Sequence, residues 1–401
     1  MTLFFRTISV DEAIRVARSI AVRMPFEVVP LSGACGRVLD SNIAADVDIP
    51  GFSRATMDGY ALVTADTVGA SEALPAILRM VGRVGMGNGT EITVAPGKCI
   101  YVPTGGAVPK GADGLAMVEF CEQLGDEILV RRPVSFGENI MARGEDFAGG
   151  SIVLEKGTLL SHRDIGALAA VGASRVPVSK QPVVGVISTG NELIPVPDIP
   201  EMGQVRDINS YLIGAFLSSN GCIPEYFGIV RDDRAAFRIV LKKALEHCDA
   251  VLLSGGSSKD DRDLTADMIR ESGEVLAHGI SIAPGKPTII GRVQGKPVIG
   301  LPGHPASAYI VALVIVQPLL AEMTGERDRG LLTRTMVLAE NIPSARGRED
   351  YVRVRFHDGK AYPEFGKSGL INTLIRSDGL IRIPAGKEGL EEGDCVEVIL
   401  W

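Results

Sequence analysis

The middle of the chain alternates between apolar runs and amphipathic segments. Between residues 183 and 325 the apolar runs include PVVGVIST, PEYFGIV and DAVLLSGG. The segments between them repeat apolar side chains at helical spacing, as at Phe237, Leu241 and Leu245. Strands that are apolar throughout and are separated by helices are typical of a parallel sheet with both faces covered. The pattern predicts an α/β domain with a parallel sheet.

Two further segments carry helical periodicity. In residues 9–23 apolar positions share one face, and Ser9 followed by Glu12 is a capping-box pattern. A second helix is expected after Ser161, a suitable N-cap residue. Because the two segments are similar in length and helix content, we expect them to pack together as one discontinuous, elongated domain.

The rest of the chain is made of short apolar runs separated by Gly and Pro. This texture predicts an inserted β-rich domain after the first helical segment and a small C-terminal β-barrel. The expected fold is therefore a multidomain α/β and β protein. Its expected domains are 1–48 with 138–178, 49–137, 179–328 and 329–401.

Composition narrows the class of protein. At 401 residues the chain is too long for one ordinary core, and its net charge of −8 lacks the basic excess of nucleic-acid-binding proteins. The most apolar run, residues 308–321, is shorter than the ~20 residues of a membrane span, so we expect a buried core helix and no membrane contact. The six cysteines are dispersed, without CxxC pairs, and are expected to be buried reduced thiols in a cytoplasmic protein.

Three loops leave the carboxyl ends of expected strands with polar or glycine-rich sequences. They are STGNE, SGGSSKDDRD and LPGHPAS. Ligands of open α/β sheets bind at these strand ends, so we expect the three loops to form one site. In the second loop Ser254, Gly255, Gly256 and Ser257 have N–H and hydroxyl donors for a phosphate, although a tight turn alone would also explain them.

Acidic and basic residues in these loops add possible chemistry. Glu192 and Asp263 are candidate ligands of a hard cation such as Mg²⁺, and each could instead be a helix cap or a solvated acid. Of Asp232 and Asp233, one is expected to cap the next helix, which leaves the other for a ligand. Lys286, in APGKP, could contact a phosphate or remain a surface lysine.

Outside the α/β domain the local signals are weaker. Asp58 precedes a glycine in a turn, and Thr104 and Asp146 also lie in turn sequences. Histidines do not cluster, and neither a Ser-His-Asp order nor a Cys-His pair stands out, which disfavours covalent acyl chemistry.

Taken together, the motifs resemble a known family. SRATMDGYAL, VPTGGAVPKGAD, RGEDFAGG, STGNEL, GIVRDD, SGGSSKDDRD, PGKP and GLPGHPASA follow one another as in the molybdopterin molybdenumtransferases, the family of MoeA and the gephyrin E domain. The resemblance implies an elongated four-part subunit and a homodimer. It also implies Mg²⁺-dependent insertion of molybdate, or of tungstate, into adenylylated molybdopterin with release of AMP. The molybdopterin adenylyltransferase is an expected contact partner.

The resemblance also implies roles for individual residues. Asp58, Thr104 and Asp146 are expected to face the α/β domain of the partner subunit across a cleft. The expected catalytic residues are Asp58, Thr104, Asp146 and Asp232; the expected Mg²⁺ ligands are Glu192 and Asp263; and the expected substrate-binding residues are Ser254, Gly255, Gly256, Ser257, Lys286, Pro302, Gly303 and Ser368.

Several positions depart from the family pattern. Gly279 and Ala283 stand where many members have lysines, so an oxyanion should bind more weakly or differently unless Lys259 supplies the lost charge. His304 replaces a usual asparagine, and Arg346 and Arg348 fall in the C-terminal region that contributes to the family site. Two alternative functions therefore stay open: a non-catalytic pterin-nucleotide binding or scaffold protein, and a nucleotide hydrolase built on the same α/β domain.

Overall fold

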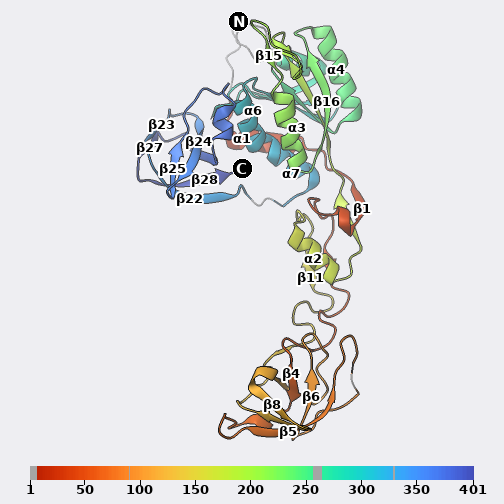
Figure 1. Cartoon of the computed structure of the whole chain (residues 1–401). Coiled ribbons are helices and arrows are strands. Elements are labelled where there is room, and N and C mark those ends of the chain that lie inside the picture. The colour runs from red at the N-terminus through yellow and green to blue at the C-terminus, as the bar shows by residue number, and fades with distance from the viewer. Residues whose placement is uncertain (1–6, 90, 256–263, 328–329) are drawn as a thin grey trace.

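The computed structural model describes residues 7–89, 91–255, 264–327 and 330–401. The chain is elongated (Figure 1): a β-domain occupies one end, a small part around helix α2 lies in the middle, and the α/β domain and a β-barrel lie side by side at the other end. The expected fold class, an elongated α/β and β multidomain protein, is confirmed.

The α/β domain contains a six-stranded sheet in the order β16-β13-β17-β21-β20-β18. The first four strands are parallel, as expected, whereas β20 and β18 run antiparallel to their neighbours. The expectation of a wholly parallel sheet was wrong at this edge. Only Gln294 and Gly295 connect β20 to β21. A connection of two residues forms a hairpin between antiparallel strands, because a crossover to a parallel strand needs about a dozen residues or more. The strands are β13 (Val183–Thr189), β16 (Ile223–Val230), β17 (Ala250–Ser254), β18 (Gly273–His278), β20 (Ile289–Val293) and β21 (Lys296–Leu301).

Helices cover both faces of this sheet. One face packs against α1 (Val10–Ser19), α3 (Asn209–Ser219), α6 (Pro305–Val311) and α7 (Gln317–Thr324), and the other against α4 (Arg234–His247) and α5 (Leu264–Ser272). Ser9 caps α1 by accepting a hydrogen bond from the Glu12 N–H at 3.2 Å. Two short strands, β14 (Leu193–Ile194) and β15 (Val205–Arg206), pair in parallel as a separate two-stranded sheet.

The apolar run near residue 310 is a buried helix, as expected. The helix Pro305–Thr324, which includes a π-helical segment (Ala312–Val316), is long and apolar enough to cross a membrane. However, 72% of its most apolar window is buried inside the protein. It is therefore the core helix of the α/β domain.

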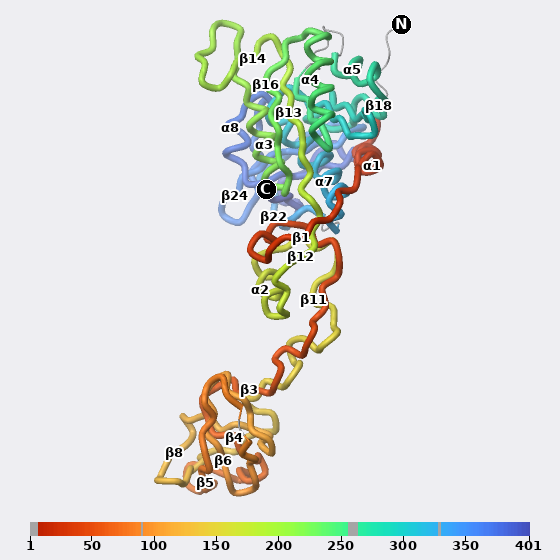
Figure 2. Tube along the Cα trace, turned by 90° about the vertical axis from the view of Figure 1, so that its right-hand side faces the viewer, coloured from red at the N-terminus to blue at the C-terminus, as the bar shows by residue number. Residues whose placement is uncertain are grey.

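In the middle part, the segment that leads from α1 to the β-domain and the segment that leads back to the α/β domain lie side by side (Figure 2). The pairs are β1 (Phe26–Pro30) with β12 (Arg175–Ser179), β2 (Ile43–Ala44) with β11 (Ile152–Leu154) and β3 (Arg54–Ala55) with β10 (Ile140–Met141). Helix α2 (His162–Ala170) begins at a capping box in which the Ser161 N–H donates to Asp164 at 2.7 Å. A 3₁₀ turn, η1 (Leu31–Gly33), packs near it.

The β-domain has its own sheet in the order β7-β4-β6-β5-β9-β8. Its strands are β4 (Gly59–Leu62), β5 (Ala76–Arg83), β6 (Lys98–Val102), β7 (Gly114–Met117), β8 (Cys121–Leu124) and β9 (Glu127–Val130), with 3₁₀ turns η2 (Thr64–Thr67) and η3 (Val118–Phe120). Two apolar clusters fill the domain, so it has a core separate from that of the α/β domain.

The C-terminal sheet closes into the expected β-barrel. Its order is β24-β25-β22-β28-β26, and β26 pairs again with β24. The strands are β22 (Thr333–Leu338), β24 (Glu349–His357), β25 (Lys360–Pro363), β26 (Gly379–Ile383) and β28 (Cys395–Leu400), with a minor pair β23 (Ile342–Pro343) and β27 (Gly389–Leu390) and a short helix α8 (Asn372–Ile375). Strand β19 (Ile282–Ala283) of the α/β domain pairs with β24, which fixes the barrel beside the sheet.

All six cysteines are free. Cys99, Cys222 and Cys248 are buried, and burial raises the pKa of each of these thiols to about 12. The expectation of burial was wrong for Cys35 and Cys395, which are exposed.

Candidate functional site

A pocket of about 990 Å³ lies at the carboxyl ends of β13, β17 and β21. Its wall includes Thr189 and Glu192 from the first expected loop, Ser254 and Gly255 from the second, and the Pro302–Gly303 turn from the third. The loops that the sequence places at strand ends therefore do meet in one site. The barrel forms another part of the wall, through Arg346, Arg348 and Ser368.

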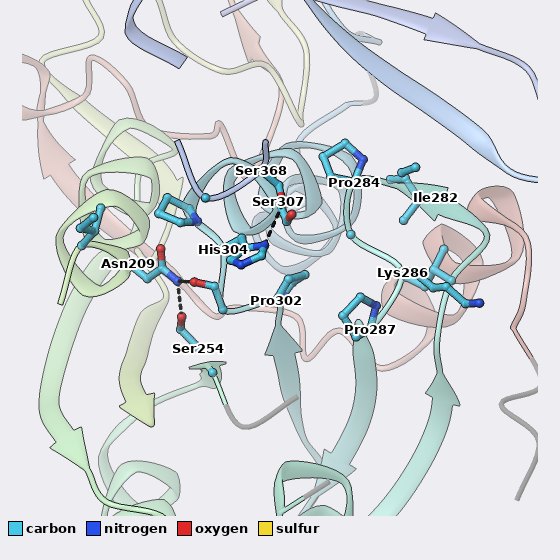
Figure 3. A pocket seen from close by; sticks show the side chains of 18 of the residues that line it. Asn209, Ser254, Ile282, Pro284, Lys286, Pro287, Pro302, His304, Ser307 and Ser368 are labelled. Atoms are coloured by element: carbon cyan, nitrogen blue, oxygen red, sulfur yellow. Dashed lines mark hydrogen bonds between the residues drawn. The ribbon is translucent and has the colours of Figure 1, made fainter. Parts of the chain in front are cut away.

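Asn209, at the start of α3, links two of these loops. Its Nδ2 donates to Ser254 Oγ at 2.7 Å and to the Gly303 carbonyl at 2.8 Å (Figure 3). Asn209 is only 7% exposed and was not singled out from the sequence. No local pattern distinguishes this asparagine, because its partners are 45 and 94 residues away in the chain.

A buried acid holds the start of α3 against the sheet. Asp207 Oδ1 accepts hydrogen bonds from Ser188 Oγ at 2.9 Å and from the Ser210 N–H at 3.1 Å. Its Oδ2 accepts from Ser210 Oγ at 2.5 Å. Sequence reasoning missed this group, although an acid three residues before a serine at the start of an apolar helix is a capping signal. The network fixes Asn209, two residues further on.

The backbone at Gly255 requires glycine. Its φ is +107°, a region that side chains disfavour, and a Cβ there would lie 2.0 Å from the Thr189 carbonyl oxygen. The loop after β17 thus lies directly against the end of β13. This contact keeps the donors of Ser254 and Gly255 next to the loop that carries Glu192.

Positive charge lies on the other side of the pocket. Lys286 is exposed and stands opposite Asn209 and Ser254 (Figure 3). Arg346 and Arg348 approach from the barrel, and each contacts an acid, Glu388 at 3.2 Å and Asp350 at 2.9 Å. Their charge is therefore partly neutralised by the barrel itself, whereas no ion pair of Lys286 occurs among the described residues.

His304 connects the two domains at the pocket. Its Nδ1 shares a hydrogen bond of 2.8 Å with Ser368 Oγ, and the Ala306 N–H donates to the Ser368 carbonyl at 3.1 Å. The expected substrate-binding residues Ser368, Pro302 and Gly303 thus lie in the same wall. Their part in binding stays a prediction.

The two positions that lack family lysines differ in their surroundings. Ala283 lines the pocket, but Gly279 does not. Gly279 has a φ of +97°, which a lysine would adopt only with strain. A lysine restored at Ala283 would therefore add charge to the pocket, whereas one at Gly279 would first disturb the backbone.

Asp232 and Asp233 divide their roles as expected for a cap and a free acid. Asp233 caps α4 by accepting from the Ala236 N–H at 2.7 Å. The Asp232 N–H donates to Asn191 Oδ1 at 3.2 Å, and its carboxylate is exposed outside the pocket wall. The catalytic role expected of Asp232 stays a prediction.

The β-domain, which contains the expected catalytic residues Asp58 and Thr104, lies at the opposite end of the chain from the α/β domain (Figure 1). In the β-domain, the Thr104 N–H and Oγ1 donate to Asp58 Oδ1 at 2.7 and 2.8 Å, and these hydrogen bonds hold the Asp58 pKa below its ordinary value. Asp146 is exposed in the connection next to β10. Gly256, Ser257, Lys259 and Asp263 lie outside the described residues.

Comparison with known proteins assigns each part of the chain. Residues 8–172 match the MoeA N-terminal region (domain I and II), 185–322 match the probable molybdopterin binding domain, and 335–401 match the MoeA C-terminal region (domain IV). A molybdopterin molybdenumtransferase of Staphylococcus aureus is 30% identical over 399 residues, which cover 98% of this chain and 95% of that protein. The chain belongs to the MoeA family.

Other relatives agree with this family membership. A putative molybdopterin biosynthesis protein of Methanocaldococcus jannaschii is 35% identical, covering 93% of this chain and 91% of that protein. The crystal structure of the molybdopterin biosynthesis MoeA protein of Pyrococcus horikoshii OT3 has a TM-score of 0.87 and 33% identity, covering 99% of this chain and all of that one. This MoeA-family chain is an enzyme of molybdenum cofactor biosynthesis.

Proposed function

We propose that this MoeA-family enzyme inserts molybdate into adenylylated molybdopterin and releases AMP. The pocket at the strand ends is the observation that supports this reaction most strongly. Its volume of about 990 Å³ is in the upper range of small-molecule sites. It combines hydroxyl and N–H donors at Ser254 and Gly255, a carboxylate at Glu192 and cations at Lys286 and Arg348.

The two sides of the pocket suit two different anionic groups. Ser254 and Gly255 lie at the end of a strand, where hydroxyl and backbone N–H donors suit a phosphate. Lys286, Arg346 and Arg348 present charged donors that attract a free oxyanion such as molybdate or tungstate. The barrel lines the same pocket through Arg346, Arg348 and Ser368.

Glu192 is suited to hold Mg²⁺ together with substrate phosphates. Its carboxylate is exposed on the pocket wall, and oxygen ligands from one or two carboxylates plus phosphates are typical of Mg²⁺ sites. Asp207 is less suited, because it is buried and its oxygens already accept hydrogen bonds from Ser188 and Ser210. The second expected ligand, Asp263, lies outside the described residues, and substrate phosphates would supply further oxygen ligands. Bound there, Mg²⁺ would neutralise charge on the phosphoanhydride.

The active site is proposed to form between two subunits. Asp58 and Thr104 are exposed and already hydrogen-bonded to each other, yet they lie at the opposite end of the chain from the pocket. A homodimer in which each β-domain reaches the other subunit's pocket would bring them together. The proposal includes the cytoplasmic location and the contact with the molybdopterin adenylyltransferase that the sequence leads us to expect.

Subunit mixing tests the shared site. Asp58→Ala and Glu192→Gln proteins should each be inactive, and a mixed dimer should regain one intact site, formed by Glu192 of the first variant and Asp58 of the second. Recovered activity after co-refolding supports the arrangement. If the mixture stays as inactive as its components while size analysis shows mixed dimers, the shared site is wrong.

AMP release tests the reaction. Purified protein receives adenylylated molybdopterin and Mg²⁺ with molybdate, with tungstate or with neither oxyanion. We expect release that requires Mg²⁺ and is stimulated by one oxyanion, which names the metal that is inserted. Release without any oxyanion would identify a hydrolase, and binding of an intermediate that persists with both oxyanions would identify a binding protein.

A further inference from the structure

We infer that Asn209 is a positioning residue that directs the Ser254 hydroxyl proton toward the phosphate of the bound substrate. This inference rests on the proposed function, because it assigns a donor to the phosphate group held in the same pocket. Asn209 would act through Ser254 and would not itself contact the reacting atoms.

The hydrogen-bond partners fix the orientation of the Asn209 amide. The Gly303 carbonyl oxygen can only accept a hydrogen bond, so the group 2.8 Å from it must be the amide nitrogen. The second N–H of the same nitrogen then points to Ser254 Oγ at 2.7 Å. The Ser254 oxygen is thereby an acceptor in this contact, and its single proton is left for another partner.

The position of Ser254 makes a ligand the natural acceptor. Ser254 ends strand β17, is 3% exposed and lines the pocket. Among the described residues its only side-chain hydrogen bond is the one it accepts from Asn209. A phosphate offers only acceptors, so a hydroxyl whose donor direction is fixed complements it.

The surroundings of Asn209 are rigid enough for this role. Asp207 and Ser210 tie the first turn of α3 to Ser188 on strand β13. The Asn209 Oδ1 atom is buried and has no hydrogen-bond partner in the described part of the chain. A buried carbonyl without a partner destabilises the fold, so the benefit of an asparagine here lies in its two donors.

Four variants test the inference. Asn209→Asp keeps the shape but can only accept, so Ser254 would donate to the new carboxylate and turn away from the phosphate. We expect the KM for adenylylated molybdopterin to rise about 10-fold or more, the scale of a lost hydrogen bond to a charged group, with a smaller change in kcat. Asn209→Ala should raise KM less. In a Ser254→Ala background Asn209→Ala should change KM by less than about twofold, because the two residues act as a unit.

A matched control comes from the other end of the same helix. Asn220, whose Nδ2 donates to the Phe216 carbonyl, lies outside this pocket, and Asn220→Ala should leave KM unchanged. Thermal melts of every variant separate misfolding from altered binding. Additive effects of Asn209→Ala and Ser254→Ala on KM, or an unchanged KM in a folded Asn209→Asp protein, would overturn the inference.

A binding measurement separates this inference from the proposed reaction. Calorimetry with inorganic pyrophosphate reports the phosphate-binding loop whether or not the enzyme turns over. Weaker pyrophosphate binding by Asn209→Ala than by wild type, with no such difference in a Ser254→Ala background, supports the positioning role even if AMP release fails, because neither substitution adds a charge. Equal binding by Asn209→Ala and wild type contradicts the role even if AMP release is normal.

Discussion

The contact between Gly255 and strand β13 gives a sharp prediction for a single added methyl group. In Gly255→Ala the new Cβ would stand 2.0 Å from the Thr189 carbonyl oxygen, whereas ordinary contacts are at least 3.0 Å. Strands β13 and β17 are paired neighbours, so the loop must move by about 1 Å relative to a strand that is fixed in the sheet. Alanine must also adopt a φ of +107° or abandon it.

The expected cost combines these two effects. A sparsely populated backbone conformation costs about 1–3 kcal/mol, and forced overpacking costs a similar amount. For a domain of this size ~3 kcal/mol lowers the melting temperature by about 10 °C. The displaced loop should also bind phosphate poorly, because the Ser254 donor moves with it.

The neighbouring Gly303 supplies a matched control. Its φ is not in the positive region, and an added Cβ would meet only the Gly255 Cα at 3.8 Å, an ordinary contact. Gly303→Ala should therefore melt within about 2–4 °C of wild type, which corresponds to less than 1 kcal/mol. Differential scanning calorimetry on both variants tests the reasoning. Equal melting temperatures for Gly255→Ala and Gly303→Ala would refute it.

Three further predictions concern charge and capping. Ala283→Lys adds a cation to the pocket wall and should lower the half-saturating molybdate concentration in the AMP assay. The expected change is only about fivefold, because the site is partly solvated. An unchanged half-saturating concentration would show that Ala283 does not belong to the oxyanion site. Asp233→Ala removes the α4 cap and should lower the free energy of unfolding by about 1 kcal/mol in denaturant. Asp232→Ala should lose activity but keep its stability. Loss of activity without loss of stability in Asp233→Ala, together with loss of stability in Asp232→Ala, would contradict the assignment. Thr104→Val removes one of the hydrogen bonds to Asp58 and should raise the Asp58 pKa toward its ordinary value, which NMR titration would detect. Because the wild-type pKa is lowered, Asp58 stays ionised from weakly acidic pH upward. It should therefore give no inflection near neutral pH in the pH–rate profile.

The sequence was sufficient for the elements whose signals are local. Helix α1 begins after Ser9, α2 after Ser161 and α4 after Asp233, each at a side-chain cap that the pattern indicates. The antiparallel edge of the sheet was missed because its signal is only the two residues Gln294 and Gly295, which look like any loop. A short turn between two apolar strands decides strand direction as strongly as a long helix does.

The sequence predicted the part of the site that is formed by loops at the carboxyl ends of the strands. The loops of Glu192, Ser254 and Gly303 meet because parallel strands end at one edge. Asn209 was not predictable, because its importance depends on two partners that only the folded chain brings near. The hydrogen bonds between Asp58 and Thr104 are visible in one chain, but the proposed relation of Asp58 to the pocket involves a second subunit.

The most direct test of the account is a single-turnover reaction that measures AMP and metal-loaded pterin together. Wild-type protein with adenylylated molybdopterin, Mg²⁺ and the preferred oxyanion should form the two products in equal amounts, and Glu192→Gln, folded to the same degree, should form neither. AMP without metal-loaded pterin in the wild type, or full yield of both products in Glu192→Gln, would contradict the assignment of this pocket as the site of metal insertion.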